Sequence, residues 1–159
     1  MIRYLTLPEE ASTLALGRRL AELVDPPFLL FLRGELGAGK TTLARGMLRG
    51  LGHRGPVRSP SFTLLESYDL PDRTVHHLDF YRVAEPEELE AIGVRELLDP
   101  SAIVVIEWPE RGGARLPVPD LDLRLAIGRG GLRRARLLAG SARGRAVLEH
   151  LRRRAGRAP

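Results

Sequence analysis

Cysteine is absent from the 159 residues of this chain. Disulfide bonds and thiolate metal sites are therefore excluded, and the composition fits a reducing compartment. The chain also lacks an apolar run near the ~20 residues that a membrane span needs, and Met1-Ile2-Arg3-Tyr4 does not start a signal peptide. From these absences we expect a cytoplasmic protein that does not enter membranes.

Lysine is nearly absent as well, because Lys40 is the only lysine among the 25 basic residues. It lies in Gly34-Glu35-Leu36-Gly37-Ala38-Gly39-Lys40-Thr41, a complete G-x-x-x-x-G-K-[ST] phosphate-binding loop. A compact ammonium on a flexible stem can reach the β- and γ-phosphates, which the rigid guanidinium of arginine does not easily do. This loop predicts nucleoside triphosphate binding. In the empty protein we expect Lys40 to be an unpaired charge in a surface loop.

The surroundings of the loop fit the same prediction. An apolar run of strand length, 28–32, precedes it, and a helical pattern over 41–51 follows it. Backbone N–H groups of such a loop can close on phosphates, and the helix N-terminus adds positive potential. The hydroxyl of Thr41 is then expected to be a Mg²⁺ ligand.

The whole pattern predicts a single P-loop nucleoside-triphosphatase domain of the α/β class over 1–154, with a frayed tail over 155–159. We expect a mostly parallel central sheet flanked by helices, with a C-terminal antiparallel hairpin. Thr6 and Glu9 have the spacing of a capping box and predict the start of the first helix. Strands are expected over 3–7, 28–32, 62–70, 74–81, 103–106, 120–127 and 132–139, and helices up to about 24 and over 41–51, 85–98 and 141–154.

Two acids follow candidate strands and could hold Mg²⁺ or orient water: Glu107 after 103–106, and Asp79 after 75–78. The more apolar strand favours Glu107, but neighbouring strands could bring both acids to one ion. Either carboxylate could also merely cap a strand. His76 and His77 are adjacent and should point to opposite sheet faces, so one of them is expected to face the core.

Other positions leave more than one interpretation open. Trp108, the only tryptophan, could anchor the core or line the nucleotide site. Ser59, Ser61 and Thr63 could form a nucleotide-sensing switch or a structural turn. Residues 129–159 hold ten arginines against one acid, a net charge of +9. That segment could face RNA or a partner, or it could be a solvated surface in an arginine-rich protein.

Five ordered motifs resemble the bacterial TsaE (YjeE) family. They are 34–42, 59–63, 77–82, 85–89 and 107–110, and the resemblance extends over nearly the whole chain. It implies an ATPase of the tRNA threonylcarbamoyladenosine modification system, with ATP and Mg²⁺ as cofactors. In that family the protein binds and slowly hydrolyses ATP. Its partners TsaD and TsaB transfer the threonylcarbamoyl group to an adenosine of tRNAs that read codons beginning with A. Contact with tRNA is expected to be indirect, through the complex.

The resemblance also assigns roles to individual residues. Lys40, Asp79 and Glu107 would be catalytic, and Thr41, Glu107 and Asp79 would serve Mg²⁺. The nucleotide would contact Glu10, Gly37, Ala38, Gly39, Lys40, Thr41, Thr42, Trp108 and Arg133. Ser59, Ser61 and Thr63 would form a switch-like loop, in which Ser61 departs from the threonine that is usual in the family.

Two other functions remain possible from the sequence. A small-molecule or nucleotide kinase has the same loop and size, but it needs an arginine-bearing lid, and no arginine cluster in helical-hairpin context flanks the proline-rich stretch 115–119. A nucleotide-switched RNA-binding module would act through 129–157. Beyond Tyr81 only Trp108 is aromatic, so that segment lacks a platform on which bases could stack.

Overall fold

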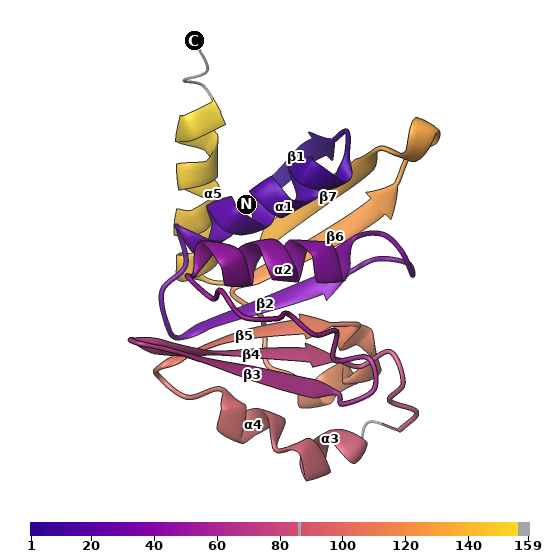
Figure 1. The fold of residues 1–159 in the computed structure, drawn as a ribbon, viewed down its shortest axis with the longest axis vertical. Coiled ribbons are helices and arrows are strands. Elements are labelled where there is room, and N and C mark those ends of the chain that lie inside the picture. The colour runs from indigo at the N-terminus through magenta and orange to yellow at the C-terminus, as the bar shows by residue number, and fades with distance from the viewer. Residues whose placement is uncertain (86, 156–159) are drawn as a thin grey trace.

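A seven-stranded mixed sheet forms the centre of the protein in a computed structural model, which describes residues 1–85 and 87–155 (Figure 1). The strand order is β1-β7-β6-β2-β5-β4-β3. The strands are β1 (Ile2–Leu7), β2 (Phe28–Arg33), β3 (Leu65–Leu70), β4 (Arg73–Asp79), β5 (Ala102–Glu107), β6 (Leu121–Ile127) and β7 (Arg133–Ala139). Only the middle of this sheet is parallel, since β2 pairs in parallel with β5 and β6, and β4 with β5.

The parallel strands are the most apolar segments of the chain. All six residues of β5 are buried, as are the first five of β2, because helices and loops cover both faces of the sheet here. The outer strands pair antiparallel: β1 with β7, β7 with β6, and β3 with β4. The predicted α/β domain, its mostly parallel centre and its C-terminal hairpin are therefore confirmed.

Helices cover the two faces unequally. On one face, α1 (Glu10–Ala21), α2 (Lys40–Gly50) and α5 (Ala142–Ala155) enclose the larger apolar core (Figure 1). On the other, α3 (Glu88–Ile92) and α4 (Val94–Leu97) cover a smaller core over β2, β4 and β5. Short 3₁₀ turns, η1 (Pro109–Arg111), η2 (Gly113–Arg115) and η3 (Arg129–Gly131), complete the described elements. Within the described residues, no helix is long and apolar enough to cross a membrane.

Helices α1 and α2 pack closely because glycines lie at their contact. A Cβ atom at Gly17 would lie 2.3 Å from the carbonyl oxygen of Leu43, and one at Gly46 would lie 2.4 Å from that of Leu14. Real side chains do not approach backbone atoms so closely. The two glycines therefore let α1 pack directly on α2, the helix that follows the phosphate loop.

Several predicted boundaries are wrong. The capping box does not form, because Thr6 pairs with Arg134 inside the sheet, and Glu9 caps α1 without a side-chain hydrogen bond. Helix α1 ends at Ala21, before the predicted 24. The predicted helix 85–98 is divided into α3 and α4 by Gly93, whose φ of 69° interrupts the helix.

Two further boundaries concern the middle and the end of the chain. Strand β3 begins at Leu65, later than predicted, because a turn closed by the Leu64 N–H on the Pro60 carbonyl precedes it. Helix α5 ends at Ala155. The rest of the predicted frayed tail, 156–159, lies outside the described residues.

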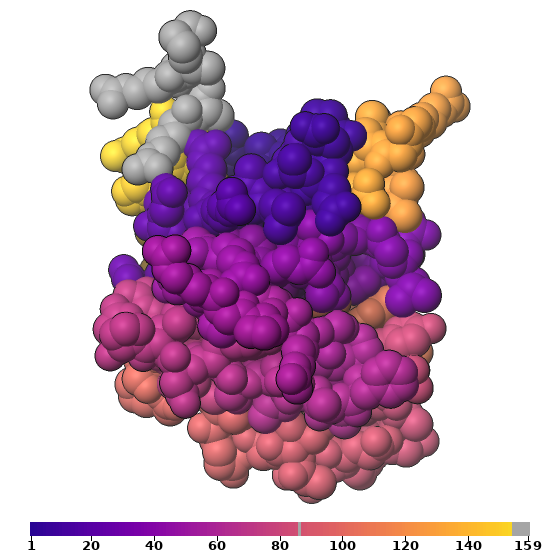
Figure 2. All heavy atoms as spheres, in the orientation of Figure 1, coloured from indigo at the N-terminus to yellow at the C-terminus, as the bar shows by residue number. Residues whose placement is uncertain are grey.

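The tip of the β6–β7 hairpin projects from the body of the molecule (orange, upper right in Figure 2).

Candidate functional site

The phosphate loop connects the end of β2 to the start of α2. Gly37 has a φ of 79° and Gly39 a φ of 105°, both in the left-handed region that favours glycine. The N–H of buried Ala38 donates to the Glu35 carbonyl and closes the turn. Gly39 caps α2, so the helix begins at Lys40 and directs its N-terminus toward the cleft beside the loop. The predicted strand, glycine loop and helix are confirmed in this order.

Lys40 is not the unpaired surface charge that the sequence led us to expect. Only 4% of the residue is exposed, and its Nζ donates to the carbonyls of Gly34 (2.7 Å) and Glu35 (2.9 Å). The Nζ atom also lies 4.3 Å from the centroid of the Trp108 ring. Burial lowers the pKa of Lys40, although the nearby Glu107 carboxylate acts in the opposite direction. The Lys40 side chain is therefore folded back on its own loop.

Glu107 connects the loop helix to the sheet. The Thr41 hydroxyl donates to its carboxylate at 3.0 and 3.2 Å from the two oxygens. On the other side, His77 Nε2 lies 2.8 Å from Oε1, and both side chains are buried. Because a carboxylate only accepts hydrogen bonds, Nε2 carries the proton that joins the pair. His77 therefore orients the Glu107 carboxylate without lining the cleft itself, a role that the sequence did not predict.

Asp79 lies directly beside Glu107, because the parallel register of β4 and β5 pairs these two residues. Its carboxylate accepts hydrogen bonds from the Tyr81 N–H (2.9 Å) and from the Ser61 hydroxyl (3.4 Å). Burial raises the pKa of Asp79, and the neighbouring Glu107 charge adds to that rise. The expectation that neighbouring strands bring both acids together is confirmed, while their action on one ion stays a prediction.

His76 has a different environment from its neighbour. Its Nδ1 lies 2.8 Å from the Ser67 hydroxyl on β3, at an exposed contact, whereas His77 is buried with 1% exposed. The predicted division into one core-facing and one outer histidine is confirmed. Burial lowers the pKa of His76, which lies away from the cleft.

Trp108 lines the cleft as well as packing on the smaller core. Its φ of 56° is unusual for a residue with a side chain, and among described non-glycine residues only Leu64 shares a positive φ. The centroid of its ring lies 5.1 Å from the centroid of the Tyr81 ring. The strained backbone turns the indole from the end of β5 toward Lys40, so both interpretations of this tryptophan are partly right.

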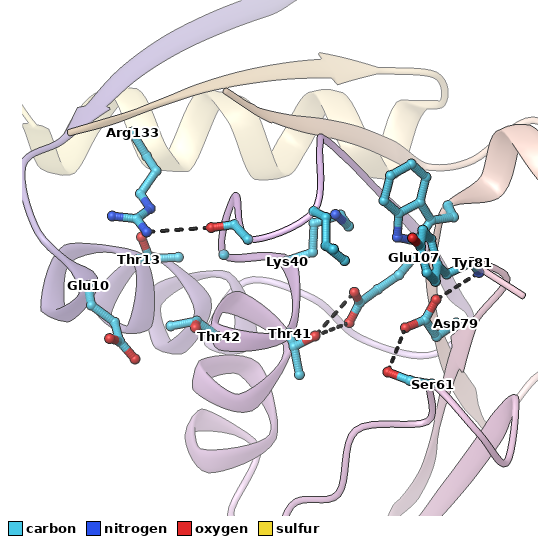
Figure 3. Close-up of a pocket in the computed structure, with 14 residues that line it drawn as sticks. Glu10, Thr13, Lys40, Thr41, Thr42, Ser61, Asp79, Tyr81, Glu107 and Arg133 are labelled. Atoms are coloured by element: carbon cyan, nitrogen blue, oxygen red, sulfur yellow. Dashed lines mark hydrogen bonds between the residues drawn. The ribbon is translucent and has the colours of Figure 1, made fainter. Parts of the chain in front are cut away.

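Helix α1 and strand β7 form the other side of the cleft (Figure 3). Glu10 and Thr13 reach it from α1, and Arg133 from β7. Arg133 donates to the carbonyls of Gly131 (2.9 Å) and Gly37 (3.5 Å), so its guanidinium lies against the phosphate loop. The structure thus brings Glu10 and Arg133, which are distant in sequence, to the same cleft.

The predicted switch-like loop is only partly at the site. Ser61 lines the cleft through its bond to Asp79, and Ser59 reaches it only through the Ser61 hydroxyl, at 2.6 Å. Thr63 instead donates to Glu66 at 3.1 Å and does not line the cleft. Arg82 stacks over the exposed ring of Phe62 at 4.2 Å, which holds the loop to the residues after β4. Switching by this loop stays a prediction.

The complete cleft measures about 230 Å³. It is lined by Glu10, Thr13, Leu36, Gly37, Gly39, Lys40, Thr41, Thr42, Ser61, Asp79, Tyr81, Glu107, Trp108 and Arg133. Of the predicted nucleotide contacts only Ala38 is missing from this lining, since this residue of the loop is fully buried.

Thr13, Leu36 and Tyr81 also line the cleft, although the sequence did not predict them there. Leu36 and Tyr81 lie inside motifs that were recognised, so their positions were available as a signal. Thr13 had no such signal. Its hydroxyl is buried, with 1% of the residue exposed, and has no hydrogen-bond partner among the described residues. Buried polar atoms are rarely left unpaired, so Thr13 is a candidate contact for whatever occupies the cleft.

The arrangement fits a hydrated divalent cation. Asp79 and Glu107 are two adjacent buried carboxylates, and Thr41 adds a hydroxyl to Glu107. In the described residues no group of three or more His, Cys, Asp or Glu side chains could hold a metal alone. Mg²⁺ suits such a partial site, because it is commonly held by one or two carboxylates together with water and phosphate oxygens.

Comparisons with known proteins agree on one family. The family model described as "Threonylcarbamoyl adenosine biosynthesis protein TsaE" matches residues 7–135. The chain is 44% identical over 120 residues to a tRNA threonylcarbamoyladenosine biosynthesis protein TsaE of Haemophilus influenzae, covering 72% of this chain and 76% of that protein. With the protein of the same name from a Nostoc species it shares 36% identity over 137 residues, 82% of each chain.

A solved structure extends the agreement to the fold. Bacillus subtilis YdiB superposes with a TM-score of 0.79 at 26% sequence identity, over 97% of both chains. The similarity therefore includes the described elements on both sides of the cleft.

Proposed function

This chain belongs to the TsaE family, which takes part in tRNA threonylcarbamoyladenosine biosynthesis, and on that premise we propose that it is a Mg²⁺-dependent ATPase. It binds ATP in the cleft beside the phosphate loop and hydrolyses it slowly. It acts with homologues of TsaD and TsaB, which transfer the threonylcarbamoyl group to adenosine in tRNAs that read codons beginning with A.

One observation carries this proposal: Lys40, Thr41, Glu107 and Asp79 converge from three segments of the chain on one end of the parallel strands. Thr41 contacts Glu107 at 3.0 Å, and the register of β4 and β5 places Asp79 beside it. Ligand sites in open α/β sheets lie outside the carboxyl ends of the strands, where these residues are. A cation on one side and two acids on the other suit a phosphate–metal pair.

Different residues of the cleft would bind the phosphates, the metal and the attacking water. Lys40 would exchange its two loop carbonyls for phosphate oxygens, and the N–H groups of 37–42 would bind the phosphates. Thr41 and Glu107 would hold Mg²⁺, with Glu107 kept in place by His77. Asp79 would orient the attacking water or a metal-bound water. When bound, Mg²⁺ neutralises charge that develops on the phosphate oxygens.

The proposal is tested by incubating the protein with ATP labelled on its γ-phosphate, with and without Mg²⁺. Release of inorganic phosphate supports an ATPase, whereas a phosphorylated metabolite would indicate a kinase. Tight binding without turnover, even with TsaB and TsaD homologues present, would indicate a nucleotide switch. A pull-down with those homologues, with and without ATP, tests the assembly.

Glu107→Gln identifies the metal site within that assay. We expect at least a 100-fold loss of Mg²⁺-dependent turnover with a smaller loss of ATP affinity, because the variant removes charge stabilisation needed during transfer. The matched control is Glu110→Gln, which removes a nearby acid that is paired with Arg33 at the surface. Equal turnover in Glu107→Gln and the parent protein would contradict the assignment.

A further inference from the structure

One part of the sheet has no helix over it in the described residues. On β1, β7 and β6, alternate residues such as Leu7, Leu123 and Leu137 point into the core under α1, α2 and α5. The residues between them point the opposite way. The smaller core under α3 and α4 contains no residue of these three strands. We call this uncovered side the open face and define it by Tyr4, Asp122, Arg124, Arg134 and Arg136.

The open face concentrates positive charge. Arg136 lies opposite Arg124 on one side and Tyr4 on the other, so two guanidinium groups face each other across neighbouring strands. Arg134 lies two residues along the same strand, which places it on the same face about 7 Å away. Like charges directly opposite each other destabilise a sheet, so this arrangement does not serve folding.

These charges have no counterions from the described part of the chain. The acid of the open face, Asp122, is bound to Arg33 at 2.8 Å, and the same guanidinium also contacts Glu110 at 3.0 Å. No hydrogen bond or ion pair connects the guanidinium groups of Arg124, Arg134 or Arg136 to any described residue. The open face can therefore bind a negatively charged partner.

The structure also divides the basic C-terminal segment, which the sequence presents as one region. Arg133 points to the nucleotide cleft, Arg134 and Arg136 to the open face, and Arg152 and Arg153 are exposed on α5. The three groups belong to different surfaces. Among the arginines that the structure describes in this segment, these groups therefore do not form a single charged patch.

We propose that the open face binds RNA, with the three arginines on phosphates and Tyr4 against a base. Guanidinium groups match phosphate oxygens through paired hydrogen bonds. Tyr4, which is 71% exposed, supplies an aromatic surface on which a base can stack. An acidic protein segment would match the charge but would not need the ring. This inference goes beyond the ATPase function and adds a direct contact with the tRNA on which the family's pathway acts.

The expected binding is weak and strongly dependent on salt. Three phosphate contacts predict a slope of about −2.1 to −2.7 for log K against log salt concentration. Affinity should then fall about 20- to 40-fold between 50 and 200 mM salt. The experiment measures the fluorescence anisotropy of a labelled, unmodified tRNA transcript titrated with the full chain at both salt concentrations.

Two double variants separate the open face from general positive charge. In the double variant Arg134→Gln with Arg136→Gln, tRNA affinity should fall only about 3-fold between 50 and 200 mM salt, the value for one remaining phosphate contact. The matched control, Arg152→Gln with Arg153→Gln, removes the same charge from α5 and should keep the parental slope. Equal loss of slope in both double variants, or no loss in the first, would overturn the proposal.

Tyr4 distinguishes RNA from an acidic protein partner. Tyr4→Ala should weaken tRNA binding about 5- to 150-fold, the range for one stacked base, whereas Tyr4→Phe should retain it. Polyglutamate that competes with tRNA while Tyr4→Ala binds tRNA normally would overturn the RNA assignment in favour of an acidic protein. ATP-induced quenching of the single tryptophan should remain parental in every variant, so that loss of RNA binding is separable from loss of the ATPase site.

Discussion

Replacing Lys40 by methionine tests the most unexpected feature of the site, the lysine folded onto its own loop. Methionine keeps most of the apolar stem and removes only the ammonium. Each hydrogen bond from a charged donor contributes about 1.5–3 kcal/mol, and Lys40 makes two of them, to Gly34 and Glu35. The desolvation that lowers its pKa offsets much of this gain, and water can replace the ammonium at carbonyls near the surface.

The net expectation for the nucleotide-free protein is a loss of about 1–2 kcal/mol in the free energy of unfolding. For a domain of this size that loss lowers the melting temperature by about 2–8 °C. The measurement is thermal denaturation followed by circular dichroism. The matched control is Arg45→Met, which removes an exposed cation from the same helix and should change the melting temperature by less than about 2 °C.

ATP gives the same variant a second, independent readout. At an ATP concentration 100 times its Kd, the parent protein should gain about 2.7 kcal/mol, or about 5–11 °C in melting temperature. Lys40→Met should show little of this shift. A variant as stable as the parent would refute the folded-back lysine, and a full ATP shift in the variant would refute its contact with phosphate.

Three further predictions concern the residues around this loop. Asp79→Asn should raise the melting temperature of the metal-free protein at pH 7. Burial and Glu107 raise the pKa of Asp79, so the protonated carboxyl favours the folded state at low pH. This contribution to stability is lost as the pH rises through the pKa of the folded protein. The difference in melting temperature between variant and parent should therefore vanish near pH 4. Gly46→Ala should cost about 1–3 kcal/mol in thermal denaturation, because its Cβ would meet the Leu14 carbonyl. Thr13→Val should stabilise the empty protein by about 1 kcal/mol and weaken ATP binding measured by calorimetry; unchanged affinity would exclude Thr13 from the nucleotide contacts.

The phosphate loop was predictable because its chemistry is contained in consecutive residues. Gly37 and Gly39 act through local backbone geometry, and their spacing with Lys40 is enough to indicate the turn. The buried strands β2 and β5 were equally clear, since their apolar runs have strand length. Short-range geometry of this kind is set by the residues themselves, and it is what the sequence by itself determined.

The first helix and the segment 85–98 show where local patterns fail. Thr6 and Glu9 had the spacing of a capping box, but pairing of β1 with β7 drew Thr6 into the sheet. Gly93 adopted a left-handed conformation and split one helical pattern into two short helices. A long-range strand pairing changed the expected start of the first helix. In 85–98 the cause was a backbone conformation at Gly93 that a helical pattern does not reveal.

Only the tertiary structure decided how the site is assembled. The parallel register of β4 and β5 places Asp79 beside Glu107, and the close contact of α1 with α2 brings Thr13 over the phosphate loop. Pairing of β7 with β1 and β6 gives the two faces of that strand different surroundings, so Arg133 lies at the cleft and its neighbour Arg134 on the open face, because adjacent side chains on a strand point to opposite faces. These relations depend on which distant segments pack together, and burial of the shared apolar core fixes that choice for the chain as a whole.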